Sequence, residues 1–124
     1  MTTDPRTLRI IVVDDEALAR ELIRSYLEDN PRFEIVAECA NGFEAVEKVA
    51  ELKPDLVLLD IQMPKMSGFE LLEVLDPLPE IIFATAHDDY ALDAFEVHAV
   101  DYLLKPFSSD RLEAALGQIG RAHV

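Results

Sequence analysis

The feature that most constrains the fold of this chain is a fivefold alternation of short apolar runs with amphipathic helical stretches. The runs are rich in Val, Ile and Leu, as buried strands are. We expect strands at Leu8–Val13, Phe33–Cys39, Leu56–Leu59, Glu80–Ala84 and Val100–Leu104. Between and after them we expect helices at Glu16–Asp29, from a cap at Asn41 through Ala50, from Ser67 to Leu75, at Asp89–Phe95 and at Ser108–Ile119.

Strands that alternate with helices through short connections form a parallel sheet with right-handed crossovers and helices on both faces. The sequence therefore predicts an α/β fold. It predicts one domain over residues 1–124, with a structured core at about 8–119 and a loose tail at 1–6.

Apolar positions predict which side of each element is buried. The predicted inner positions are Leu18, Leu22, Ile23, Tyr26 and Leu27 in the first helix, Phe43, Val46, Val49 and Ala50 in the second, and Leu112, Ala115, Leu116 and Ile119 in the last. The second strand alternates, which predicts Phe33, Ile35, Ala37 and Cys39 on one side and Glu34, Val36 and Glu38 on the other.

The charge balance excludes several classes of partner. With 11 basic and 25 acidic residues, the chain has a formal net charge of −14. Such a surface repels nucleic-acid phosphates and anionic membranes, so we expect neither DNA nor membrane to bind this chain directly. The single cysteine, Cys39, excludes an internal disulfide. The simplest expected location is the cytoplasm.

Polar residues follow four of the predicted strands, at the edge where α/β proteins bind ligands. Asp14 and Asp15 follow the first strand, Asp60 the third, Thr85 the fourth and Lys105 the fifth. Taken singly, each has an ordinary explanation: a helix cap, a turn former, a strand-end residue or a solvated cation. Taken together, three carboxylates at one sheet edge would repel one another unless a cation joined them.

An all-oxygen ligand set that leaves room for water and phosphate oxygens is typical of Mg²⁺. A carboxylate held beside that ion can act as a nucleophile towards phosphorus and form an aspartyl phosphate. Phosphoryl transfer needs positioning and neutralised oxygens, which Lys105 and the Thr85 hydroxyl would help to supply.

These residues resemble the receiver domain of two-component response regulators. The resemblance extends over about Leu8 to Ile119 and rests on five elements in order: Val13-Asp-Asp-Glu16, Leu58-Leu-Asp-Ile-Gln-Met-Pro64 with Gly68, Ala84-Thr-Ala86, Tyr102, and Lys105-Pro-Phe107. The family implies a flavodoxin-like (βα)5 three-layer sandwich with strand order 2-1-3-4-5.

The resemblance also implies roles for the site residues. Asp60 would accept the phosphoryl group, and Asp14, Asp15, Asp60 and the backbone carbonyl of Gln62 would bind Mg²⁺. Thr85 and Lys105 would contact the phosphoryl group, and the bond between Lys105 and Pro106 would be cis. Such a domain is expected to catalyse only its own phosphorylation and dephosphorylation.

The family pattern implies a conformational switch as well. Thr85 would move towards the new phosphoryl group, and Tyr102 would swing into the space that Thr85 leaves. Gln62 and His87, each two residues after a site residue, would tune how long the phosphate survives.

The stretch Phe83 to Phe107 most resembles the LytTR-type regulators, which join a receiver to a C-terminal DNA-binding domain. The implied partners are a sensor histidine kinase and DNA, the latter only through an output domain outside this chain. The face of the fourth helix, fifth strand and last helix is a candidate homodimer surface. The alternative is a stand-alone receiver that acts by protein contact.

Three rivals remain at this point. A haloacid dehalogenase-like phosphatase would want an acid where Gln62 stands and its nucleophile on the first strand. A nucleotide or flavin module would want a glycine-rich loop in place of Asp14-Asp15-Glu16. A degenerate receiver would lack some of the five site residues, and all are present.

Overall fold

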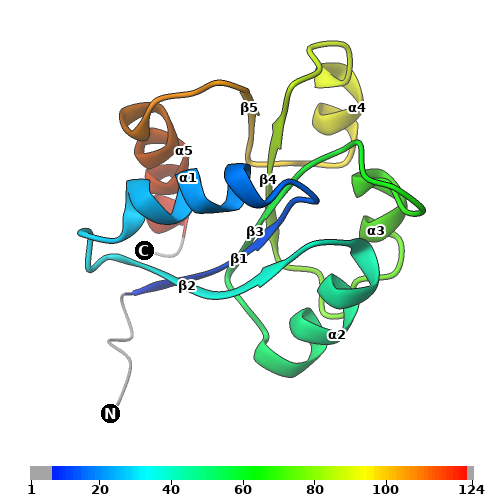
Figure 1. Ribbon diagram of the computed structural model, residues 1–124, viewed down its shortest axis with the longest axis horizontal. Coiled ribbons are helices and arrows are strands. Elements are labelled where there is room, and N and C mark those ends of the chain that lie inside the picture. Colours follow the sequence, from blue (N-terminus) through cyan, green and yellow to red (C-terminus); the bar gives the residue numbers. More distant parts are fainter. Residues whose placement is uncertain (1–6, 123–124) are drawn as a thin grey trace.

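Figure 1 shows the computed structural model, which describes residues 7–122. The predicted tail at residues 1–6 lies outside that range. The elements are β1 Leu8–Val13, α1 Ala17–Leu27, β2 Phe33–Cys39, α2 Gly42–Leu52, β3 Leu56–Leu59, α3 Gly68–Leu72, β4 Glu80–Thr85, α4 Ala91–Glu96, β5 Asp101–Leu104 and α5 Ser109–Ala122. They alternate as the sequence predicts. The largest differences in bounds are that α3 ends three residues earlier than expected and α5 continues to Ala122.

The five strands form one parallel sheet in the order β2-β1-β3-β4-β5, which confirms the flavodoxin-like order. Helices α1 and α5 lie side by side over one face, and α2, α3 and α4 cover the other (Figure 1). Each face has its own apolar core. The largest fully buried side chains include Ile10, Leu58 and Leu116 on the α1/α5 side and Phe83, Leu59 and Leu71 on the other.

Strand register brings the strand ends together. Val13 pairs with Leu59, so the residues that follow them, Asp14 and Asp60, emerge side by side at the carboxyl edge. The Asp60 N–H donates to the Val13 carbonyl at 3.0 Å, which extends this pairing by one residue. At the other end of the edge, the Lys105 N–H donates to the Thr85 carbonyl at 2.8 Å.

The prediction for the sides of β2 is wrong. Ile10 pairs with Ile35 but Ile11 pairs with Ala37, so Val36 is an extra residue in the ladder. This register shift reverses the alternation halfway along the strand. Phe33 and Ile35 pack with the α1/α5 core, whereas Val36, Ala37 and Cys39 pack with the opposite core.

The predicted inner faces are right for α5 and partly wrong for α1 and α2. All four predicted positions of α5 are buried. In α1, Ile23 and Leu27 are buried but Leu18 and Leu22 are exposed. In α2 the buried positions are Gly42, Ala45 and Val49, while Phe43 and Ala50 face solvent.

Helices α2 and α3 begin with a side-chain cap, including the predicted cap at Asn41. Ser67 and Glu70 form a complete capping box at α3. Asn41 caps α2 by accepting a hydrogen bond from the Glu44 N–H at 2.9 Å, and the Glu44 carboxylate accepts from the Ala40 N–H at 2.8 Å. Across residues 7–122, none of the helices has the length and apolar character that a membrane span requires.

Candidate functional site

Three carboxylates meet at the carboxyl edge of the central strands. Asp14 and Asp15 follow β1, Asp60 follows β3, and one oxygen of each lies within 4.8 Å of the others. Asp14 and Asp60 are 2% and 6% exposed, whereas Asp15 is open to solvent. The prediction that these acids converge is therefore confirmed, although Asp14 and Asp60 lie 46 residues apart in sequence.

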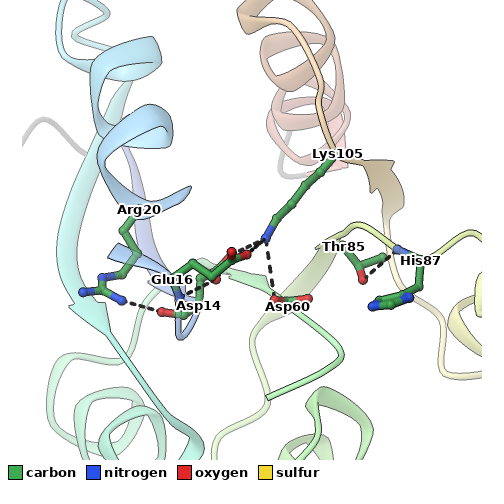
Figure 2. A network of polar contacts seen from close by, with 7 residues as sticks. All are labelled: Asp14, Glu16, Arg20, Asp60, Thr85, His87 and Lys105. Carbon is green, nitrogen blue, oxygen red and sulfur yellow. Dashed lines mark hydrogen bonds and ion pairs between the residues drawn. The ribbon is translucent and has the colours of Figure 1, made fainter. Parts of the chain in front are cut away.

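Lys105 supplies the positive charge of this cluster. Figure 2 shows its side chain reaching from the end of β5 towards both buried carboxylates. Its Nζ lies 2.7 Å from Asp14 Oδ2, 3.6 Å from Asp60 Oδ2 and 3.4 Å from Glu16 Oε1. The alternative of a merely solvated lysine is wrong, since its side chain is only 18% exposed.

Burial and charge act on the site in opposite directions. Burial raises the pKa of Asp60; Lys105 lowers it, and the neighbouring carboxylates of Asp14 and Asp15 raise it again, so that the net shift is upward. Burial alone would lower the pKa of Lys105, but its hydrogen bond to Asp14 and the charge of Asp60 outweigh burial and raise it. The lysine is therefore held charged, while Asp60 is a destabilised anion that gains from a further positive partner.

The backbone around Asp14 holds its carboxylate in place. Asp14 Oδ1 accepts the Glu16 N–H at 2.9 Å, and Arg20 donates to the Asp14 carbonyl at 2.6 Å. Glu16, not Asp15, stands at the N-cap of α1 and makes no side-chain cap bond. The capping explanation for Asp15 is therefore wrong, and its side chain is free to serve the cluster.

Gly68 lets the backbone after Asp60 turn back on itself. Its N–H donates to the Ile61 carbonyl at 2.8 Å. A Cβ at this position would lie 2.6 Å from the Asp60 carbonyl oxygen and 3.1 Å from the Ile61 Cα. Only glycine allows the start of α3 to pack so tightly against the backbone of Asp60 and Ile61.

Thr85, His87 and Tyr102 form a linked group at the end of β4. Thr85 is fully buried, and its hydroxyl accepts the His87 N–H at 3.3 Å. The Tyr102 hydroxyl donates to the His87 carbonyl. Thr85 and Tyr102 are thus joined through the backbone of His87, which gives the predicted switch pair a physical connection.

The side chains of Tyr102 and Asp60 open on different depressions. Tyr102 lines a hollow between α4 and β5 with Ala91, Ala94 and Phe95. Asp60 lies in an open pocket of about 220 Å³ that is also lined by Asp15, Glu16, Gln62, Ala86, His87 and Lys105. The structure therefore places Gln62 and His87 in the same pocket as Asp60, whereas Tyr102 lines a different depression; the role of Gln62 and His87 in phosphate lifetime stays a prediction.

The donor set of this pocket fits a hard divalent cation. Each of the three carboxylates has an oxygen within 4.8 Å of the other two, and burial makes Asp60 an unfavourable anion without a further positive neighbour. Oxygen donors of this kind suit Mg²⁺ better than zinc, which prefers nitrogen and sulfur. That the backbone carbonyl of Gln62 is a further ligand of Mg²⁺ stays a prediction.

Sequence reasoning missed three contributors. Glu16 adds a third acid beside Lys105, Arg20 ties down the Asp14 carbonyl, and the Tyr90 hydroxyl accepts from Gln62 Nε2 at 2.9 Å. Glu16 stands in the Asp-Asp-Glu run, so its position gave a signal. Arg20 and Tyr90 gave none, because their roles depend on side-chain directions that spacing does not encode.

The cis bond between Lys105 and Pro106 was predicted from the family resemblance and is present. A second cis bond, between Asp76 and Pro77, was not predicted.

Comparison with known proteins shows which family has this fold and this arrangement of acids. The profile of the response regulator receiver domain matches residues 10–117. A transcriptional regulatory protein, BtsR of Escherichia coli K12, is 49% identical over 114 residues, which are 90% of this chain and 48% of BtsR. An uncharacterized response regulatory protein of Yersinia pestis is 51% identical over 116 residues, 92% of this chain and 49% of that protein. The chain thus spans about half the length of these curated relatives.

Solved structures share the whole fold. The receiver domain of AraT, a response regulator from Geobacillus stearothermophilus, superposes with a TM-score of 0.83 at 33% identity, covering 94% of this chain and 95% of that one. The response regulator domain of Thermotoga maritima CheB gives 0.80 at 30% identity, covering 92% and 97%.

Proposed function

The chain belongs to the response regulator receiver domain family of two-component signalling, and from that premise we propose that Asp60 is the residue that accepts the phosphoryl group. One observation carries this assignment. Asp60 is the buried acid that lines the open pocket, beside two further acids and 3.6 Å from Lys105. Asp14 is equally buried, but its two oxygens are engaged by Lys105 and the Glu16 N–H.

In the proposed transfer, a carboxylate oxygen of Asp60 forms a bond to phosphorus, and the bond from phosphorus to the donor breaks. The electron pair of that bond leaves with the donor, a histidine nitrogen of a sensor kinase or the carboxylate of an acyl phosphate. Lys105 lies where it can pair with an incoming phosphoryl oxygen, since its Nζ is already within reach of Asp60 Oδ2.

Asp14, Asp15 and Asp60, with the Gln62 carbonyl, would hold Mg²⁺. When bound, Mg²⁺ neutralises charge on the phosphoryl oxygens and lowers the repulsion between them and the acids. Lys105 keeps its own positive charge throughout, because Asp14 and Asp60 raise its pKa.

The phosphorylated state would act through the group at the end of β4. The new oxygens draw the Thr85 hydroxyl away from the His87 N–H, which frees the backbone segment that also binds Tyr102. A shift of Tyr102 alters the surface of α4, β5 and α5. This face is our candidate for partner binding and for a homodimer.

We propose that the output is transcriptional. The relatives include transcriptional regulatory proteins of about twice this length, and Phe83–Phe107 resembles LytTR-type regulators. A DNA-binding domain would then follow the receiver in the whole protein. Beyond its own phosphorylation and dephosphorylation, the domain is proposed not to be an enzyme.

The test is intact-mass analysis after incubation with a small acyl phosphate and Mg²⁺. We expect one added phosphoryl group, absent from Asp60→Asn and absent when a chelator is present. Asp29→Asn is a matched control, because Asp29 is an exposed acid in the turn that follows α1. It should be phosphorylated like the wild type.

An unmodified wild-type mass, or a phosphoryl group that persists in Asp60→Asn, overturns the assignment. Turnover of a generic phosphate ester would instead favour the phosphatase rival. That rival also lacks support at Gln62, where it would want a second acid.

A further inference from the structure

The rim of the pocket contains a contact for which the phosphoacceptor role gives no reason. Gln62 is exposed and lines the pocket beside Asp60 and His87. A glutamine in this setting would normally sample many rotamers. Here its Nε2 donates to the Tyr90 hydroxyl at 2.9 Å, so the carboxamide has one preferred position.

Tyr90 is itself firmly placed. Its ring packs against Phe69 with 6.0 Å between centroids, and Phe69 packs against the fully buried Phe83 of β4 at 5.0 Å. The Tyr90 carbonyl accepts the Ala94 N–H at 2.9 Å at the start of α4. The rings of Phe83, Phe69 and Tyr90 thus form a packed row from the sheet to the rim of the pocket. Gln62 is hydrogen-bonded to the outer end of this row.

The bond to Tyr90 also orients the carboxamide. Because Nε2 is used as the donor, the Oε1 atom of Gln62 remains available as an acceptor beside the pocket. An acceptor held at the mouth can orient a water molecule, as positioned glutamines do in other phosphoryl-transfer sites. Asp60 and Gln62 line the same open pocket, so water that enters the pocket can reach both residues.

We propose that Tyr90 is a positioning residue that holds Gln62 so that it orients the water that hydrolyses the aspartyl phosphate. This rests on the proposed role of Asp60. In the step, the water oxygen bonds to phosphorus and the bond from phosphorus to the Asp60 oxygen breaks. Its electron pair stays on the carboxylate, and a water proton passes to the released phosphate.

Tyr90 also contacts the linked group at the end of β4 that contains Thr85, His87 and Tyr102. The His87 ring meets the Tyr90 ring edge-on, with 6.3 Å between centroids. The His87 backbone is bonded to Thr85 and Tyr102. These contacts form a continuous path from Thr85 through His87 and Tyr90 to Gln62, and our proposal includes that a movement of Thr85 changes the phosphate lifetime along this path.

The experiment compares wild type, Tyr90→Phe, Gln62→Ala and the double variant. Each is phosphorylated with a small acyl phosphate and Mg²⁺, the donor is removed by desalting, and the phosphorylated fraction is followed by intact mass. Tyr90→Phe keeps the ring packing and removes only the hydroxyl. We expect its phosphate to survive about fivefold longer, the effect of losing one neutral hydrogen bond from the transition state.

Non-additivity separates positioning from a general structural effect. Gln62→Ala should lengthen the lifetime at least as much, and adding Tyr90→Phe to it should change nothing further. Gln118→Ala, which removes an exposed glutamine that bonds Asp101, should keep the wild-type lifetime.

An unchanged or shorter lifetime in Tyr90→Phe, or an equal effect of Tyr90→Phe with and without Gln62, overturns the proposal. These outcomes differ from a failure of the proposed function, in which the wild type would take up no phosphoryl group at all.

Discussion

At Gly68 the start of α3 approaches the backbone of Asp60 so closely that no side chain fits between them. The nearest atoms to an added Cβ are the Asp60 carbonyl oxygen at 2.6 Å and the Ile61 Cα at 3.1 Å, and neither can rotate away. We expect Gly68→Ala to lower the free energy of unfolding by about 1–3 kcal/mol, the usual effect of overpacking. It should also slow phosphorylation, because the strain falls on Asp60. Chemical denaturation and intact mass measure the two effects.

Gly117 provides the matched control. It lies in α5, and an added Cβ there would meet nothing within 4 Å. Gly117→Ala should therefore raise the free energy of unfolding by about 0.5–1 kcal/mol, because alanine restricts the unfolded chain more than glycine does. Equal effects of the two substitutions would contradict the close approach at Gly68.

At the scale of single residues, the sequence predicted the charged residues of the site but missed the side chains that hold them in place. Asp14, Asp15, Asp60, Thr85 and Lys105 are all strand-end residues, and parallel strands must end at one edge. Arg20 and Tyr90 act through bonds from side chains on neighbouring segments. The bonds depend on rotamers and on the packing of Phe69, which no spacing rule contains.

At the scale of elements, Asp101 fastens β5 to α5. Arg111 donates to both Asp101 oxygens at 2.9 Å, and Gln118 donates to Oδ2 at 2.8 Å. Burial of Asp101 raises its pKa, but the bonds from Arg111, the Tyr102 N–H and Gln118 outweigh burial and lower it. The ionised form of Asp101 is therefore favoured by folding.

We expect Asp101→Asn to lower the free energy of unfolding by about 1 kcal/mol at neutral pH, a value reduced for the partial exposure of Arg111. Because the folded-state pKa is below the unfolded one, this contribution is present above about pH 4 and is lost as the pH falls through the folded pKa. Denaturation of wild type and variant between pH 7 and pH 2.5 should show the difference disappearing. A difference that grew in acid would contradict the assigned direction.

Element predictions succeeded where one pattern dominated. Helix α5 has a single apolar face, and all four predicted inner residues are buried. In helix α2 the apolar Phe43 was assigned to the inner face, but it is exposed and the buried residues are Gly42, Ala45 and Val49. In β2 the extra residue Val36 reversed the alternation, and a register shift of this kind has no signal in apolar spacing alone.

For the whole molecule, the acidic cluster should couple metal binding to stability. Mg²⁺ that binds the folded cluster and not the unfolded chain stabilises the fold by mass action, by about 1.4 kcal/mol at tenfold excess over Kd. We expect Mg²⁺ to raise the midpoint of thermal unfolding, and a chelator to reverse the rise. Differential scanning calorimetry at constant ionic strength measures it.

Two controls make this specific. Sodium chloride at matched ionic strength should give a much smaller rise, since it screens the net charge of −14 without binding the cluster. In Asp60→Asn the Mg²⁺ effect should shrink, because one of the three converging carboxylates is gone. An equal rise in both proteins would show that Mg²⁺ acts elsewhere.

The overall architecture was predictable in two steps of different kinds. Alternation of strands and helices gave the parallel sheet and its two helical layers from physical rules alone. The strand order came from the family resemblance, because connection lengths do not distinguish which neighbour a crossover selects. The division of the core into an α1/α5 half and an α2/α3/α4 half followed only from the structure.

The two outermost strands have a consequence for how copies of this protein can meet. An open sheet edge invites a strand from another molecule, which is how many proteins aggregate. Here β5 has only four residues and starts at Asp101, while β2 carries the acids Glu34 and Glu38 and the extra residue Val36. Both edges therefore discourage the addition of further strands, which favours self-association through side-chain contacts, such as those on the α4, β5 and α5 face, over extension of the sheet.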